Sequence, residues 1–291
     1  MIEATLEKDL SPYIKPVSLR LLSLSAGLLA LTASLMAASV WFVKKESLRS
    51  FSARSAKLTH WVQTNSQEII DQHLQGLATI AQPFAAGAAD APAHFQPSAA
   101  DILKKCPAFT AINHINQDFI IDDVHPLAAN RNALRLDIKS RFDVLPVAHR
   151  AITHRKTSVT DFIDLVQGGK GVILYEPIVR EERWAGFIEG VFRLNDFNAL
   201  FLEKFAGPDY NFTIIDETNG REIYTSLPSA AVERSTPFDT YFTMRLGDRT
   251  WWVILHPKSP PLILLPLVFV LLLEICLGAF GLYWLWKSEH A

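Results

Sequence analysis

In KGVILYEPIVREERWAGFIEGVFRL, residues 170–194, two apolar runs flank the polar turn 180–183. Runs rich in Val, Ile, Tyr and Phe around a short polar turn predict an antiparallel hairpin. FTAINHINQDFIIDDVHP, residues 109–126, predicts two further strands around a polar turn, and residues 141–156 are predicted to be helical. This mixture predicts an α+β domain.

The residues that follow predict a second, smaller unit of the same kind. NDFNALFLEKF, residues 195–205, reads as a short amphipathic helix with an Asn or Asp cap. Asn219-Gly220 lies between two apolar runs, which is a strong hairpin signal, and Gly247-Asp248 marks the turn of another predicted hairpin. The boundary between the two units is expected near residue 194.

Upstream, residues 44–82 predict a long stalk helix, because they contain no proline and one glycine, Gly76. Apolar residues recur at three- and four-residue spacings and form one apolar seam: Leu48, Phe51, Leu58, Val62, Ile69 or Ile70, Leu74, Leu77 and Ala81. The seam either covers the domain's own core or pairs two stalks in a dimer. The helix is expected to end near Pro83, before a loop over residues 85–97.

The two flanks of the chain are strongly apolar. Residues 21–43 carry no charge, residues 262–286 carry only Glu274, and about 20 apolar residues are enough to cross a bilayer as a helix. The mean hydropathy of +0.15 therefore averages two predicted transmembrane helices with a polar domain. Both termini are expected on one side of the membrane. Basic residues border both ends of the first span and do not by themselves set its orientation.

Several ordered motifs between residues 105 and 205 resemble the CHASE sensor family. They are the Pro126-Leu127 step with Asn130, the Leu136-Asp137 pair, LVQGG at 165–169, YEP at 175–177 and GFIEGVFR at 186–193. The resemblance implies a tandem-PAS-like domain on a long helix, held between two transmembrane helices, with the ligand pocket in the membrane-distal unit. It also implies cytoplasmic termini and a periplasmic domain at the inner membrane of a bacterium.

With this topology the expected organisation has seven segments. They are a cytoplasmic segment (1–20), a transmembrane helix (21–43), a stalk helix (44–82), a membrane-distal unit (83–194), a membrane-proximal unit (195–258), a second transmembrane helix (262–286) and a cytoplasmic tail (287–291).

The resemblance also implies candidate ligand-binding residues. In plant cytokinin receptors of this family the aspartate of a Leu-Asp pair binds the ligand, and the matching positions here are Asp137 and the Val159-Thr160 step. A carboxylate at Asp137 could accept a hydrogen bond from an amine, and Val159 would form an apolar wall. Asp137 is equally a candidate helix cap or an ion-pair partner of Arg141. The later threonine of the plant pocket falls in the Gly168-Gly169 turn, so a cytokinin-like ligand is not implied. Three further candidates are Asn130, Gln167 and Tyr175.

The sequence carries no recognisable enzyme signature. It lacks a G-x-S-x-G elbow, a phosphate-binding P-loop and an H-E-x-x-H motif, and His149 and His154 alone do not predict a metal site. We therefore expect neither catalysis nor a cofactor. With 28 basic and 30 acidic residues, the chain has no global positive charge to hold nucleic acid.

Only five residues follow the second span, so the sequence contains no output domain after it. The signal is therefore expected to pass to a separate kinase or cyclase, or to a second copy. Glu274, which would cost about 2.5–3.5 kcal/mol in mid-membrane, and the small residues Gly278 and Gly281 are candidate contacts for such a partner, or for packing within the chain.

Two function classes remain open. The favoured one is a sensory receptor that binds a small molecule or peptide. The alternative is a non-catalytic structural or assembly subunit that uses the domain as a docking surface.

Overall fold

The computed structural model describes residues 19–228, 236–259 and 264–290. The chain forms two compact units: residues 1–53 together with 261–291, and residues 54–260. The predicted N-terminal segment 1–20 lies almost entirely outside the described residues, as do residues 262 and 263 of the second apolar run and Ala291 of the tail.

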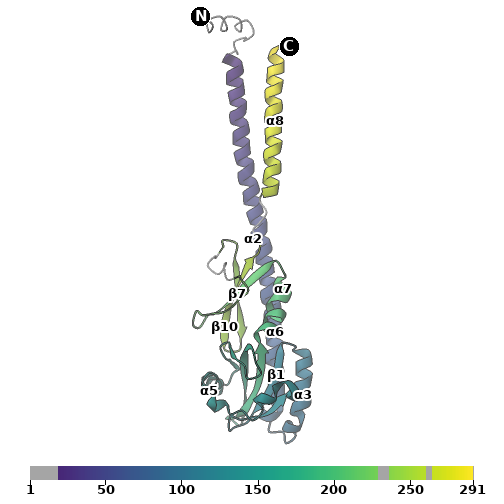
Figure 1. Cartoon of the computed structure of the whole chain (residues 1–291), viewed down its shortest axis with the longest axis vertical. Helices are drawn as coiled ribbons and strands as arrows, with labels where there is room; N and C mark the ends of the chain where they lie inside the picture. The colour runs from purple at the N-terminus through teal and green to yellow at the C-terminus, as the bar shows by residue number, and fades with distance from the viewer. Residues whose placement is uncertain (1–18, 229–235, 260–263, 291) are drawn as a thin grey trace, which may run out of the picture. The chain divides into compact units, whose positions relative to one another are not determined.

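A single helix, α2 (Leu19–Ala85), covers both the first apolar run and the predicted stalk. No proline occurs in it before Pro83, so the backbone hydrogen-bond ladder continues without a break. The predicted continuous helix and its end near Pro83 are both confirmed (Figure 1).

The apolar seam of the stalk packs into the domain that the same chain forms. Val62, Ile70 and Leu77 are fully buried in one core with residues of both sheets, and Ala81 is buried beside them. At Leu77 the fit is close, because a Cβ added to Gly190 would lie only 3.0 Å from Leu77 Cδ1. This part of the seam is therefore used within the chain, and its interpretation as a pairing surface between two stalks is wrong.

Leu77→Ala is expected to destabilise the domain by about 2–5 kcal/mol, the usual cost of such a truncation in a closed core. Gln75→Ala, on the exposed side of the same helix, should stay within about 0.5 kcal/mol of the wild type. Urea denaturation of both variants measures the difference. Equal stability of the two variants would show that the seam is not part of the core.

The first sheet of the second unit has six strands in the order β2-β1-β6-β5-β3, with β4 also paired to β5. All of its pairings are antiparallel. The elements are α3 (Ala91–Lys105), β1 (Phe109–Ile115), β2 (Ile121–His125), α4 (Leu127–Asn130), the 3-10 turns η1 (Arg131–Ala133) and η2 (Ile138–Ser140), α5 (Leu145–His154), β3 (Ser158–Val159), β4 (Ile163–Asp164), β5 (Lys170–Arg180) and β6 (Arg183–Arg193). The predicted hairpin 170–194 is confirmed as β5 and β6.

Two hydrophobic cores lie on opposite faces of this sheet. One contains side chains from α2 and α3, and the other contains Val147, Ala148 and Ala151 from α5. Figure 1 shows α3 and α5 flanking β1 accordingly. The α5 side of the sheet holds the site described below.

The loop predicted over residues 85–97 is only partly present. Residues from Ala91 onward form α3, with Pro92 in the first turn and Pro97 in the second. Pro92 is tolerated because the first N–H groups of a helix have no partner inside it, whereas Pro97 lies within the helix and removes one backbone hydrogen bond. The expectation of a loop over the whole of 85–97 is therefore wrong from Ala91 onward.

The second sheet has four antiparallel strands in the order β8-β7-β10-β9. The elements are α6 (Leu194–Asn198), a π-helical turn η3 (Ala199–Glu203), α7 (Lys204–Ala206), β7 (Tyr210–Asp216), β8 (Glu222–Thr225), β9 (Thr240–Leu246) and β10 (Arg249–Pro257). The helix predicted at 195–205 and the hairpin at Gly247-Asp248 are confirmed, and β7 and β8 pair across Asn219-Gly220 as predicted. Gly220 and Gly247 both have positive φ, which glycine adopts without strain.

In the other unit, the first part of α2 packs against α8 (Leu264–His290). Ser39 Oγ donates a hydrogen bond of 2.6 Å to Glu274 Oε1. A Cβ added to Gly278 or Gly281 would lie 3.4 Å from Thr32 or 2.9 Å from Leu28, respectively. All three candidate partner residues therefore contact α2 of the same chain.

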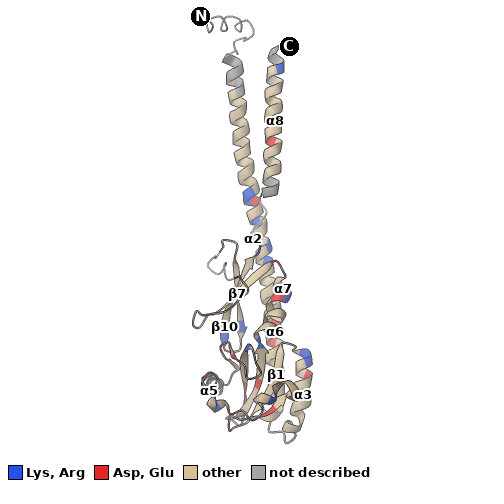
Figure 2. Cartoon of the chain, in the orientation of Figure 1, with Lys and Arg blue, Asp and Glu red and all other residues tan. Residues whose placement is uncertain are grey.

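Figure 2 shows that charged residues are sparse in both helices of this unit. Of the described helices, α2 is the one long and apolar enough to cross a membrane, in a region that begins at Ala26. The described part of α8 contains a shorter apolar stretch, which runs from Val268 to Trp284.

Candidate ligand-binding site

Three polar side chains form a buried row across the first sheet. Glu189 on β6 pairs in register with Asn113 on β1 and with Tyr175 on β5, so the three side chains share one face. Asn113 is fully buried, and Tyr175 and Glu189 are 1% and 3% exposed. We call Asn113, Glu189 and Tyr175 the polar row.

The row lies on the face that α5 covers. Tyr175 belongs to the core that contains Ile138 from η2 and Val147 from α5. Arg141, between η2 and α5, donates two hydrogen bonds to Asp143, from Nε at 2.8 Å and from Nη2 at 2.5 Å. Arg141 is near enough to the row that Tyr175 and Glu189 add to the rise of its pKa, which is due first to Asp143.

Burial changes the protonation of the row. It raises the pKa of Glu189 to about 7, a rise that a side-chain hydrogen bond with Asn113 and the charge of Arg141 oppose. It also raises the pKa of the Tyr175 phenol well above its ordinary value, and the charge of Glu189 adds to that rise. Near neutral pH the Glu189 carboxyl can therefore act as either a hydrogen-bond donor or an acceptor.

Asn113 and Glu189 are close enough for a hydrogen bond between them to lower the pKa of Glu189, but that contact does not satisfy all of their polar atoms. The Asn113 amide oxygen and Glu189 Oε2 are buried and keep unused hydrogen-bonding capacity among the described residues. Leaving such a group unpaired costs about 1–3 kcal/mol, so folded proteins rarely tolerate several in one place without a function. A ligand that bonds to these atoms would satisfy all of them together.

Of the residues predicted to bind ligand, only Tyr175 belongs to the row. Asp137 instead caps η2: its Oδ1 accepts a hydrogen bond of 2.9 Å from the Lys139 N–H, and its side chain is 43% exposed. The alternative interpretation of Asp137 as a helix cap is therefore confirmed. The other alternative, an ion pair with Arg141, is wrong, because Arg141 pairs with Asp143.

Val159 and Thr160 also lie apart from the row. Val159 pairs with Leu174, and both side chains belong to the core on the α2 side of the sheet, opposite Tyr175. Thr160 is buried, and its hydroxyl oxygen accepts a hydrogen bond of 2.9 Å from the Ile173 N–H at the sheet edge. The structure therefore does not bring Val159 and Tyr175 into one pocket.

Asn130 and Gln167 have local roles in the structure. The Asn130 amide donates a hydrogen bond of 2.9 Å to the Pro126 carbonyl, which holds the short α4 turn. Gln167 lies in the turn between β4 and β5, and its backbone carbonyl lies 3.5 Å from Arg193 Nη2. Neither residue is in the polar row.

The sequence analysis missed Asn113 and Glu189, although a signal for each was present. Glu189 stands alone in the apolar run GFIEGVF, and Asn113 lies inside the apolar strand FTAINHI. A carboxylate or amide side chain at a buried strand position is uncommon unless it is paired or functional, and that pattern could have singled out both residues.

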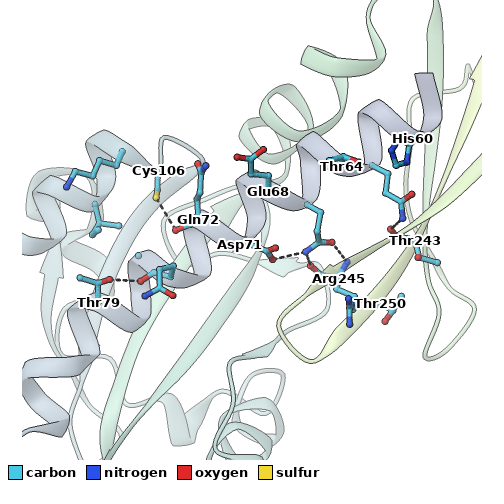
Figure 3. A pocket seen from close by; sticks show the side chains of 16 residues that line it. His60, Thr64, Glu68, Asp71, Gln72, Thr79, Cys106, Thr243, Arg245 and Thr250 are labelled. Atoms are coloured by element: carbon cyan, nitrogen blue, oxygen red, sulfur yellow. Dashed lines mark hydrogen bonds between the residues drawn. The ribbon is translucent and has the colours of Figure 1, made fainter. Parts of the chain in front are cut away.

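A second feature of the domain is a large groove along the polar face of α2, with a volume of about 1270 Å³ (Figure 3). We call it the stalk groove. Glu68 and Asp71 lie on the helix, and Lys105 and Arg245 lie on its two sides. Gln67 spans from the helix to the edge strand β9, where it donates to the Arg245 carbonyl and accepts from the Arg245 N–H. The stalk groove is open and polar, unlike the closed polar row.

Comparison with protein families and solved structures gives a consistent result. Residues 63–224 match the model of the CHASE domain. No curated protein matches the chain.

Similar solved structures include an extracellular ligand-binding receptor from Desulfohalobium retbaense (12% identity, TM-score 0.56), of which the match covers 69% of this chain and 40% of that chain. The ligand-binding domain of the Pseudomonas fluorescens chemoreceptor CtaA, in complex with L-isoleucine, is 13% identical with a TM-score of 0.56, over 74% of this chain and 95% of that chain. The ligand-binding domain of the Pseudomonas aeruginosa amino acid chemoreceptor PctC, in complex with GABA, is 12% identical with a TM-score of 0.53. The match covers 69% of this chain and 98% of that chain. At these identities the likeness concerns the fold.

Proposed function

We propose, since this chain belongs to the CHASE domain family, that it is a sensory module that binds a small polar molecule at the polar row and passes the signal to a membrane partner. The observation that carries the proposal is the burial of three polar side chains, Asn113, Glu189 and Tyr175, in one row on one face of the sheet. This face is covered by η2 and α5, so a ligand would enter by displacing that cover.

The chemistry of the row favours a ligand with an amino group. An ammonium group donates hydrogen bonds to the Glu189 carboxylate and favours its charged form, and the Asn113 amide can both donate to and accept from the rest of the molecule. The similar chemoreceptor domains were solved with L-isoleucine and with GABA, which both carry an amino group. Amino acids and small amines are therefore the first probes.

The proposal is tested by thermal shift on the full chain in detergent, with L-alanine, L-valine, L-isoleucine, GABA and 1-aminobutane as probes. At least one probe should raise the melting temperature of the wild type, and Asn113→Ala should remove the shift. Asp137→Asn is the control and should keep the shift, because Asp137 caps η2 outside the row. The ligand site would lie elsewhere if Asn113→Ala responded like the wild type, and failure of every probe would contradict an amino-group ligand.

Hydrogen bonds from α5 connect the first sheet, which carries the polar row, to the second sheet. Arg150 on α5 donates a hydrogen bond of 2.5 Å from Nε to Asp248 Oδ2, in the turn between β9 and β10. Asp248 Oδ1 accepts a second bond of 2.9 Å from the Val159 N–H of β3, the strand that pairs with Tyr175 on β5. Movement of α5 on ligand binding is thereby transmitted to β10, which leads along the chain to α8.

Asp248→Ala is expected to leave probe affinity within about twofold, since the residue does not touch the row, but to uncouple the second sheet. Hydrogen exchange should then show no ligand-induced change in β9 and β10, while β5 and β6 respond as in the wild type. Glu182→Ala, which removes a surface ion pair with Arg155, serves as the control. Ligand-induced protection of β10 that persists in Asp248→Ala would contradict this route.

The membrane topology is part of the proposal. α2 and α8 each span the bilayer once, the domain lies in the periplasm, and both termini are cytoplasmic. Three observations support this: the apolar region of α2, the shorter apolar stretch of α8, and membership of the CHASE family. Because Glu274 accepts a hydrogen bond from Ser39 of the same chain, the two spans form one unit, and a partner kinase or cyclase would bind to that unit.

We propose the stalk groove as the contact with a second copy of the chain. Its helix carries Glu68 and Asp71, and its flanks carry Lys105 and Arg245, so two copies related by a two-fold axis present opposite charges to each other. The docking-subunit alternative would use exposed apolar side chains such as Phe142 or the stacked pair Tyr241 and Trp252, and it is less favoured because the chain belongs to the CHASE domain family.

A further inference from the structure

The four-stranded sheet has a cavity of its own, away from the polar row. It has a volume of about 470 Å³, within the usual range for small-molecule sites, and we call it the sheet cavity. Thr213, Glu222, Asp239, Tyr241, Trp252 and His256 are among the residues that line it. These residues come from all four strands and from the segment just before β9.

The polar side chains of the sheet cavity are held in fixed positions. His256 Nε2 lies 3.0 Å from Thr213 Oγ1, which lies 3.0 Å from Thr225 Oγ1, and His256 Nδ1 lies 3.0 Å from Asp239 Oδ2. Both partners of the last contact are about nine-tenths buried. Asp239 is fixed further by two hydrogen bonds from Thr236. The Asp239 carboxylate is thus held in a fixed position at one end of the cavity, without the mobility of a surface side chain.

Two aromatic rings form an apolar wall of the cavity. Tyr241 and Trp252 are stacked with centroids 6.1 Å apart, and they are 70% and 42% exposed. Glu222, on the edge strand β8, adds a second carboxylate. None of the described residues that line the cavity is Lys or Arg, and its one histidine, His256, lies against Asp239, so Glu222 faces no basic side chain among these residues.

We propose that the sheet cavity binds a small organic ammonium ion with an aromatic or aliphatic body. Carboxylates attract the ammonium group, and the face of Trp252 attracts it within about 6 Å through a cation–π interaction. Tyr241, Trp252 and the isoleucines of the sheet face cover the apolar body. This site is separate from the polar row and does not depend on it, so the chain would respond to two ligands.

The test is isothermal titration of the full chain in detergent with 2-phenylethylamine, and with 2-phenylethanol as its neutral analogue. Trp252→Leu and Glu222→Gln change exposed or half-exposed side chains and should fold normally. Trp61→Leu, at an aromatic residue 48% exposed on α2, is the matched control. Glu189→Gln, a change in the polar row, shows whether the measured binding depends on that row.

We expect 2-phenylethylamine to bind with a Kd of about 1 mM or tighter, and Trp252→Leu and Glu222→Gln to weaken it by about tenfold. Trp61→Leu and Glu189→Gln should bind as the wild type does. Equal affinity for 2-phenylethanol would overturn the ammonium assignment. Unchanged binding in Trp252→Leu, loss of binding in Glu189→Gln, or no binding at about 10 mM would each overturn the site.

Discussion

Glu189→Gln is expected to raise the free energy of unfolding by about 3 kcal/mol at pH 8 and to leave it nearly unchanged at pH 4. The folded protein holds the pKa of Glu189 at about 7, whereas the unfolded chain returns it to its ordinary value of 4.5. Between these two values the native state binds more protons than the unfolded state. Stability therefore falls as the pH rises through this window, and the neutral glutamine removes the penalty.

Urea denaturation of the wild type and of Glu189→Gln at intervals from pH 4 to pH 8 measures this effect. The two curves should separate above about pH 4.5 and reach their full difference above about pH 7. Other titrating groups contribute equally to both proteins and cancel in the difference. A difference that stays constant with pH would show that Glu189 is not a buried carboxyl with a raised pKa.

Arg249→Met is expected to destabilise the second sheet by about 3–5 kcal/mol. Arg249 forms ion pairs with Asp216, whose side chain is 1% exposed, and with Asp161 of the first sheet's edge. Removing the guanidinium leaves the Asp216 carboxylate buried and without its counter-charge. The protein avoids that penalty only by protonating the carboxyl or by unfolding locally.

The double variant Arg249→Met with Asp216→Asn separates this cause from lost packing. If the unpaired charge is responsible, the double variant should recover at least half of the lost stability in urea denaturation. Asp161→Asn alone should cost less than about 1 kcal/mol, because that carboxylate is half exposed. A double variant as unstable as Arg249→Met would assign the loss to packing.

Most of the fold could be predicted, because its main elements are specified by local pattern. The polar turn at 180–183 and the glycines Gly220 and Gly247 place the hairpins, and the spacing of Val62, Ile70 and Leu77 places the stalk on the core. The local pattern did not predict that α3 starts at Ala91. Pro92 is a loop signal unless the helix start is already known, and Pro97 lies inside the helix, where the local pattern argues against a helix.

The ligand site was predicted less well, for a reason that lies in sheet register. A one-residue step along a strand moves a side chain to the opposite face, so Val159 and Tyr175 separate although their strands are neighbours. Glu189 pairs with Tyr175, 14 positions away, inside the predicted hairpin 170–194, and with Asn113, 76 positions away. The long-range register between β1 and β6 that adds Asn113 is not visible in a single sequence. Tyr175 was predicted and Glu189 was not.

Proton release on ligand binding reports the ionisation of Glu189 itself, and it therefore distinguishes a ligand at the polar row from a ligand elsewhere. The probe that stabilises the wild type is titrated calorimetrically at pH 7 in two buffers of different ionisation enthalpy. With the pKa of Glu189 at about 7, an ammonium ligand that ionises it should release about half a proton per site. Binding to the wild type without proton release, or with the same release in Glu189→Gln, would contradict a ligand site at the polar row.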